Sequence, residues 1–166
     1  MEVKEMEVKK KKGAVILPGS YDPVTLGHVE IIKKAAREYE EVYVVAFVNP
    51  EKKYVFSTME RVKMLMLATD DIDNVLVSYS DGYVIDYMRD HGIEKIMKGY
   101  RNDADLEYEI KQAEWNLYHG GYETELVKCD PEMALISSTR AREIIARGEP
   151  LEKILPKKVI EFLNKR

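Results

Sequence analysis

The sequence predicts a single α/β domain built on a five-stranded parallel sheet. Short apolar segments rich in β-branched residues alternate with amphipathic segments of helical period along most of the chain. Parallel strands need a crossover connection between them, and a helix usually supplies it. At 166 residues the chain is long enough for one such domain with a sizeable core. These observations favour a Rossmann-like, doubly wound sheet with helices on both faces.

The expected strands are apolar runs that stop at turn residues. The first run leads into a turn with Gly19 and Pro23, and the second stops at Asn49 and Pro50. By this reasoning, the five strands cover residues 14–17, 42–48, 75–79, 95–98 and 124–128.

The expected helices are marked by apolar periodicity and by capping residues. Ser57 and Glu60 match a capping box, which satisfies free N–H groups at a helix start. Gly92 and Gly148 are typical of helix C-terminal caps, and Pro156 is favoured in a first turn. The six helices are expected over residues 27–36, 57–67, 83–91, 103–118 and 138–147, and from about 156 onward.

The composition predicts a soluble globular protein of the cytoplasm. Hydrophobic residues make up 45% and charged residues 34% of the chain, and no apolar run reaches the about 18 residues of a membrane span. The net charge of −4 argues against a nucleic-acid partner. The single cysteine, Cys129, excludes an internal disulfide framework and a cysteine-based metal cluster.

Residues 1–12 are predicted to be a charged N-terminal lead-in to a domain over residues 13–166. The segment lacks the uninterrupted apolar region of a signal peptide. Its alternating Val and Met residues leave open a second interpretation, in which it begins a strand or a helical turn.

The most informative segment runs from Gly19 to His28, between the first expected strand and helix. It reads Gly-Ser-Tyr-Asp-Pro-Val-Thr-Leu-Gly-His, so the chain turns tightly and opens a helix at Gly27 and His28. Free N–H groups and the positive end of the helix dipole then point to one place, which suits a phosphate, and His28 adds a donor. The alternative is an ordinary strand-to-helix turn with a surface histidine.

A second segment follows the fourth expected strand. Lys98 and Arg101 flank Gly99 at the strand end, and both cations suit phosphate oxygens. Glu109 lies in the following helix, where it could accept hydrogen bonds from a ribose or a purine amino group. The alternative is a solvated helix start, with acidic residues near the positive dipole end.

A third segment places the hydroxyls of Ser137, Ser138 and Thr139 at a helix start. Capping needs only one of them, so the other two favour an anion site slightly. All three segments follow strands of a parallel sheet, whose carboxyl ends form the usual ligand edge. No P-loop pattern and no Ser-His-Asp arrangement is present, and His91 and His119 receive no role.

Taken together, these motifs resemble those of the phosphopantetheine adenylyltransferases of coenzyme A synthesis, within the nucleotidyltransferase superfamily. The resemblance extends from about Gly13 to the C-terminus. It includes the first motif, the Lys52-Lys53 pair, the Gly-x-Arg…Asp-x-Glu-Tyr-Glu stretch and the Ile-Ser-Ser-Thr loop. Thr25, where many relatives carry a first histidine, points to this subfamily rather than to the cytidylyl- and nicotinate mononucleotide transferases.

The resemblance implies transfer of AMP from ATP to 4′-phosphopantetheine, with Mg²⁺, to give dephospho-coenzyme A and pyrophosphate. It implies catalytic roles for His28, Lys52 and Ser20, and acceptor binding by Ser20, Lys52, Tyr83 and Lys98. The implied ATP-binding residues are Ser20, Tyr21, His28, Gly99, Tyr100, Arg101, Glu109, Met133, Ala134, Leu135, Ile136, Ser137, Ser138 and Thr139. A homohexamer and feedback by coenzyme A are implied in the same way, and no protein metal ligand is expected.

The implied chemistry agrees with the residue types. A phosphate nucleophile is already anionic, so catalysis should come from alignment and charge stabilisation, with His28 stabilising the pentavalent phosphorus. Lys98 departs from the family's usual arginine and cannot form the same two-pronged contact. Two other functions stay open: a nucleotidyltransferase with another acceptor or base, and a nucleotide-binding scaffold, conceivably redesigned, with little turnover.

Overall fold

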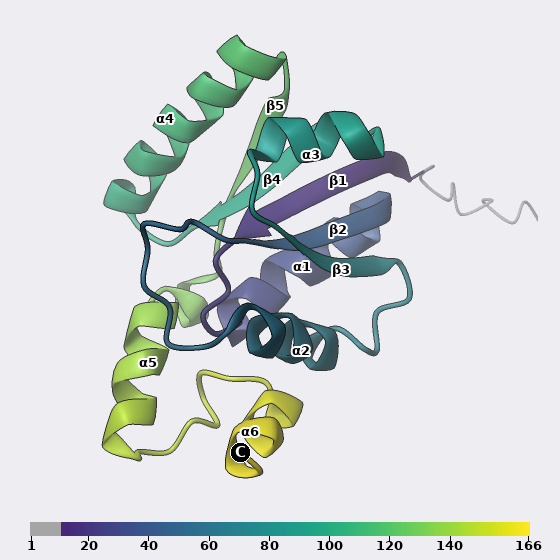
Figure 1. Cartoon of the computed structure of the whole chain (residues 1–166). Helices are drawn as coiled ribbons and strands as arrows, with labels where there is room; N and C mark the ends of the chain where they lie inside the picture. The colour runs from purple at the N-terminus through teal and green to yellow at the C-terminus, as the bar shows by residue number, and fades with distance from the viewer. Residues whose placement is uncertain (1–10) are drawn as a thin grey trace, which may run out of the picture.

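The computed structural model describes residues 11–166 and contains one five-stranded parallel sheet (Figure 1). Its strands stand in the order β3-β2-β1-β4-β5, and every neighbouring pair is parallel. The strands are β1 (Lys12–Gly19), β2 (Tyr39–Phe47), β3 (Val75–Ser80), β4 (Lys95–Tyr100) and β5 (Glu123–Lys128). The predicted fold class is confirmed.

The described chain also contains the six predicted helices. They are α1 (Leu26–Glu38), α2 (Thr58–Ala68), α3 (Val84–His91), α4 (Asp103–Gly120), α5 (Ser138–Arg147) and α6 (Lys157–Asn164). A short 3₁₀ turn, η1 (Pro131–Met133), precedes α5 and was not predicted. The capping box of Ser57 and Glu60 is present, and Gly92 and Gly148 adopt left-handed cap conformations.

Three strands begin earlier than the periodicity predicted, β5 by one residue, β1 by two and β2 by three. β1 starts at Lys12, which pairs with Tyr39, so β2 starts directly after α1. This pairing brings the Tyr39 side chain to 2% exposure, whereas Glu40 and Glu41 beside it are exposed and hide the strand pattern in the sequence. The rest of the expected lead-in, residues 1–10, lies outside the described residues.

The sheet separates two hydrophobic cores. Helices α1 and α2 cover one of its faces, and α3 covers the other (Figure 1). Val15 and Leu17 of β1 face the larger core, which includes α1, α2, α5 and α6. Ile16, between them in sequence, faces the smaller core with Met88 of α3. This alternation of side chains is the period-two pattern of a strand that is covered on both faces.

The chain order reverses beside β1, and this places the functional edge. From β1 the chain winds outward through β2 and β3, and then returns to β4 on the other side of β1. In open parallel sheets, ligands bind beyond the carboxyl ends of the strands at such a switch point. The loops after β1 and β4, which carry two of the predicted motifs, meet there.

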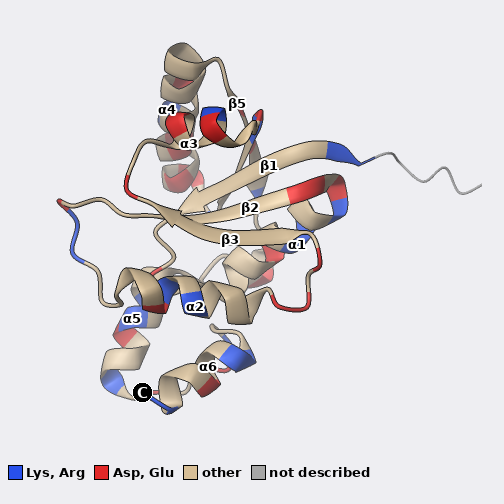
Figure 2. Ribbon diagram, turned by 45° about the vertical axis from the view of Figure 1, so that its right-hand side comes forward, with Lys and Arg blue, Asp and Glu red and all other residues tan. Residues whose placement is uncertain are grey.

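Charged residues lie mostly on the helices and loops, and the inner strands carry few (Figure 2). Lys52 and Lys53 lie on the loop after β2, at the functional edge of the sheet. None of the helices within residues 11–166 is long and apolar enough to cross a membrane.

Candidate active site

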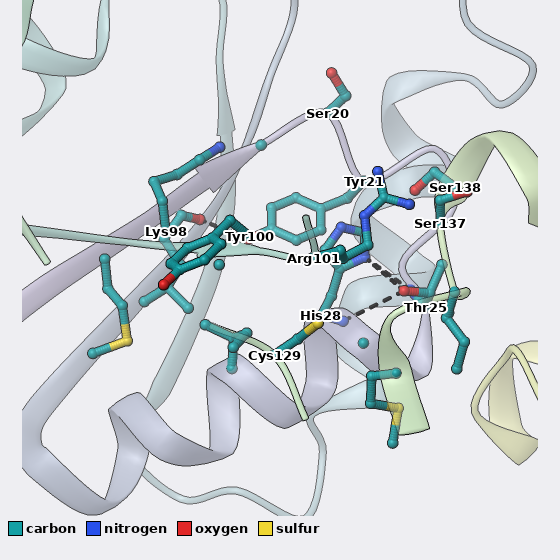
Figure 3. A pocket seen from close by; sticks show the side chains of 18 of the residues that line it. Ser20, Tyr21, Thr25, His28, Lys98, Tyr100, Arg101, Cys129, Ser137 and Ser138 are labelled. Carbon is teal, nitrogen blue, oxygen red and sulfur yellow. Dashed lines mark hydrogen bonds between the residues drawn. The ribbon is translucent and has the colours of Figure 1, made fainter. Parts of the chain in front are cut away.

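A cavity of about 250 Å³ lies at the switch point, between the ends of β1 and β4 and the starts of α1 and α5 (Figure 3). It joins the three motif segments, which are far apart in sequence. The predicted ATP-binding residues that line it are Ser20, Tyr21, His28, Gly99, Tyr100, Arg101, Met133, Ile136, Ser137 and Ser138.

His28 is oriented by the N-terminal cap of α1. The backbone N–H of Thr25 donates to His28 Nδ1 over 3.0 Å, and Thr25 Oγ1 lies 3.2 Å from the same nitrogen (Figure 3). The His28 backbone N–H in turn donates to Thr25 Oγ1 over 3.4 Å. Because a backbone N–H can only donate, Nδ1 is the acceptor, and the neutral ring carries its proton on Nε2.

The surroundings of the His28 ring favour its neutral form at pH 7. Burial lowers its pKa to about 4, and the positive charges of Lys98 and Arg101 add to this effect. Tyr21 packs edge-on against the ring, with 4.9 Å between the ring centroids, and its hydroxyl donates to the Leu17 carbonyl over 2.8 Å. His28 is therefore held as a hydrogen-bond donor without a charge of its own.

Arg101 enters the same cavity from the loop between β4 and α4. Asp105 holds its guanidinium in a two-pronged contact of 2.8 and 3.2 Å and also accepts the Arg101 backbone N–H. Asn102 caps α4 by accepting the Asp105 N–H. Gly99 lets β4 approach α1, because a Cβ there would lie 2.9 Å from Ile31 Cγ1.

A second cavity of about 440 Å³ adjoins the first, on the side of α3 and α4. Lys52, Glu109 and Val84 line it, together with polar side chains of α4. The two cavities share four lining residues, namely Pro18, Gly19, Ser20 and Lys98. A group placed against this shared wall can therefore be reached from both cavities.

Lys98 spans the shared wall and is held by two oxygen atoms. Its ammonium donates to the Pro18 carbonyl over 3.1 Å and lies 3.6 Å from Glu109 Oε2. Glu109 is only 8% exposed; burial raises the pKa of its carboxyl, and the nearby Lys98 opposes that rise. A phosphate that binds beside this ion pair can contact the Lys98 ammonium.

Lys52 joins the loop after β2 to the loop after β1. Its ammonium donates to Ser20 Oγ over 2.9 Å, although the two residues are 32 positions apart. The open mouth above both cavities is lined by Ser20, His28 and Lys52, and by Arg101 among others. Four predicted catalytic or phosphate-binding side chains thus converge on one opening.

The remaining predicted site residues lie at different depths. Thr139 lines the mouth, whereas Ala134 and Leu135 line none of these cavities, and Leu135 is 81% exposed. Tyr83 is 67% exposed at the N-cap of α3, beside Val84 of the second cavity. The binding roles of these residues stay predictions.

Sequence reasoning gave no role to Asp22 or Arg142. Asp22 is 3% exposed, and its two oxygens accept the backbone N–H groups of Val55 and Phe56, which fastens the loop after β1 to the start of α2. Arg142 lines the mouth and donates to the Asp22 carbonyl over 2.9 Å. Arg142 follows Ser138 by four residues, one helical turn, and this spacing was the available signal.

Comparisons with known proteins agree with the motifs. Residues 16–144 match the cytidylyltransferase-like family. The chain is also 38% identical to the phosphopantetheine adenylyltransferase of Clostridium novyi (strain NT) over 152 residues, which cover 90% of this chain and 94% of the relative. The predicted resemblance is confirmed: the chain belongs to the cytidylyltransferase-like nucleotidyltransferases and, among them, to the phosphopantetheine adenylyltransferases.

Proposed function

We propose that this protein transfers AMP from ATP to 4′-phosphopantetheine, which yields dephospho-coenzyme A and pyrophosphate. The observation that carries the proposal is the wall of Ser20 and Lys98 shared by two cavities, with His28 in the same mouth. Adenylyl transfer needs two polyanionic substrates whose reacting phosphates meet. The 38% identity to a phosphopantetheine adenylyltransferase supports the choice of acceptor.

The reaction needs positioning and charge stabilisation more than proton transfer. An oxygen of the acceptor phosphate attacks the α-phosphorus of ATP, a new P–O bond forms, and the bond to the pyrophosphate oxygen breaks. Because the attacking phosphate is already anionic, no base has to remove a proton. The nearest buried carboxylate of the first motif, Asp22, already accepts two backbone N–H groups, which agrees with this account.

The Nε2–H of His28 is assigned to the oxygens of the α-phosphate. Because the ring is already neutral, it keeps this donor throughout the neutral pH range. Thr25 holds the ring in place before substrate arrives. Such preorganised donors stabilise charge that grows in the transition state, at the cost of little rearrangement. Binding of the polyanion will raise the His28 pKa, which strengthens the donor further.

The lysines and Arg101 divide the remaining phosphate contacts. We assign the acceptor phosphate to Lys52 and Lys98, which border the second cavity, and the nucleotide phosphates to Arg101 and the Ser138 loop. The pantetheine arm then extends along the second cavity. Four ATP-loop residues, Met133, Ala134, Leu135 and Ile136, are assigned to the nucleotide through the family resemblance.

We further propose that Mg²⁺ enters with ATP. Within residues 11–166 no group of three or more His, Cys, Asp or Glu side chains is placed to hold a metal ion. Mg²⁺ commonly keeps several waters and is held by the phosphates of its substrate, so we assign it no protein ligand. When bound, Mg²⁺ neutralises phosphate charge. A homohexamer and feedback by coenzyme A remain predictions of the family resemblance, and a cytoplasmic location remains a prediction from the composition.

The direct test is incubation of the purified protein with ATP, Mg²⁺ and 4′-phosphopantetheine, with product mass as the readout. We expect dephospho-coenzyme A and one equivalent of pyrophosphate. Parallel reactions with CTP, and with nicotinate mononucleotide as acceptor, test the related transferases. ATP binding without any transfer would instead identify a nucleotide-binding scaffold and contradict the proposal.

A further inference from the structure

Arg61 of α2 is a buried cation without a carboxylate partner. Its side chain ranks among the largest that are fully buried, at 0% exposure. It forms no ion pair with the residues that the structure describes. Removing a charge from water is costly, and an apolar residue of similar size would fill this place without that cost. Its presence therefore calls for a reason other than stability.

The Arg61 side chain contacts residues of two loops that line the active site. Nη1 donates to the Ser20 carbonyl over 2.7 Å, across 41 positions of sequence, and Nη2 donates to Thr58 Oγ1 over 3.3 Å. The guanidinium lies 3.9 Å from the centroid of the Tyr54 ring, which is a cation–π contact. Nε has no partner in the described protein.

Through these contacts, Arg61 joins the loop after β1 to the loop after β2. Tyr54 shapes the second loop, because its hydroxyl accepts the Asn49 N–H over 2.9 Å and lies 3.4 Å from the Phe47 carbonyl. That loop also carries Lys52, whose ammonium binds Ser20 Oγ. The buried guanidinium thus holds the backbone carbonyl of Ser20, while Lys52 holds its side chain through an exposed hydrogen bond.

We infer that Arg61 is a positioning residue of the transfer reaction, which holds the Ser20 loop and the Lys52 loop in register for the acceptor phosphate. It contacts no reacting atom. Its donation to the Ser20 carbonyl fixes that peptide, and its buried charge adds a permanent positive potential behind the phosphates. The inference rests on the proposed function, because the two loops border the cavity assigned to the acceptor.

The test compares Arg61→Met, Arg61→Lys and a matched control, Met64→Ala. Met64 lies on the same helix, is also 0% exposed and belongs to the larger core. It therefore reports the effect of destabilising α2 alone. The measurements are the thermal midpoint, kcat and KM for both substrates, and hydrogen exchange of the Val55 and Phe56 amides. These two amides donate to Asp22 of the loop after β1, and their exchange needs no turnover.

We expect Arg61→Met to lower kcat/KM for phosphopantetheine about ten- to hundredfold, the range for loss of a charge-assisted hydrogen bond. KM for ATP should change less than about threefold, Arg61→Lys should recover part of the loss, and exchange of the Val55 and Phe56 amides should accelerate. Met64→Ala should lower the thermal midpoint but keep kcat/KM within about twofold, and it should leave that exchange slow.

A double-mutant cycle with Ser20→Ala separates positioning from a general effect. If Arg61 acts through Ser20, Arg61→Met should lower kcat/KM by a much smaller factor when Ser20 is already replaced by Ala. The inference would be overturned if the fold-losses of kcat/KM in the two single mutants simply multiply in the double mutant. It would also be overturned if kcat/KM for Arg61→Met stays within about twofold of wild type.

If the wild type shows no transfer at all, the proposed function fails. Unchanged exchange of the Val55 and Phe56 amides in Arg61→Met would separately refute the loop contact. Should Arg61→Met not fold, Arg61→Lys is measured in its place, with a smaller expected loss of kcat/KM. A kcat/KM and an amide exchange that both equal those of the wild type would then overturn the inference.

Discussion

The two cavities of the active site are assembled in different ways. In the first, the two nitrogen donors His28 and Arg101 are held by near neighbours: Thr25 orients His28 from three positions away, and Asp105 orients Arg101 from four. In the second, Lys52 reaches Ser20 across 32 positions, and Lys98 reaches the Pro18 carbonyl across 80. Local hydrogen bonds orient His28 and Arg101, whereas contacts between distant segments of the chain place Lys52 and Lys98.

This difference teaches where the site is rigid and where it can adapt. His28 is fixed by a cap that forms with the helix and is kept neutral by its surroundings. Lys98 is instead shared between the Pro18 carbonyl and the Glu109 carboxylate, and its flexible stem can turn to a phosphate. We expect substitutions in the first cavity to change kcat most and those in the second to change acceptor affinity.

The largest effect is expected for His28→Ala. Loss of a transition-state donor should lower kcat about a hundredfold or more and leave the ATP dissociation constant within a few-fold. Pyrophosphate release and ATP calorimetry measure the two quantities, and His119→Ala, which lies on the far end of α4, is the control. A variant with unchanged kcat would exclude His28 from the mechanism.

The low pKa of His28 predicts a loss of stability in acid. Its pKa is about 4 in the folded protein and about 6.5 when unfolded, so between these values the unfolded state binds the extra proton. The free energy of unfolding should therefore fall by about 2 kcal/mol from this group as the pH drops from 7 to 4.5. Urea titrations should show a smaller fall in His28→Gln, and an equal fall in both proteins would contradict a neutral buried His28.

Lys52→Ala should weaken acceptor binding by about tenfold, because it removes one charge-assisted phosphate contact. The neighbouring Lys53 lines none of the cavities described above, so Lys53→Ala is a closely matched control with the same change of net charge. Phosphopantetheine titrations compare the two variants. Equal weakening in both would indicate a general charge effect and not a contact by Lys52.

The smallest effect is expected for Lys98→Arg. The substitution keeps the charge, and a guanidinium can bind both the phosphate and Glu109, so acceptor affinity should stay equal or improve. Titration with phosphopantetheine measures it, and Lys95→Arg, at the opposite end of the same strand, is the control. A large loss of affinity would mean that the second cavity is built around lysine.

Much of the fold was predictable because its signals are local. The strand and helix order followed from apolar periodicity and from caps such as Ser57, which depend on residues within one turn. The limits of β1 and β2 were less predictable, because Lys12 and Tyr39 are strand residues only through pairing with each other. The 3₁₀ turn at Pro131 carried no periodic signal.

The same distinction applies to the site. The sequence alone determined that His28, Arg101 and Ser138 stand at element ends of one sheet edge, since the ends of parallel strands must share an edge. The tertiary structure decided which groups meet across the chain: Lys52 with Ser20, Lys98 with Glu109, and Arg61 with the Ser20 carbonyl. It also set the low pKa of His28, because desolvation and the nearness of cations are properties of three-dimensional packing and not of spacing along the chain.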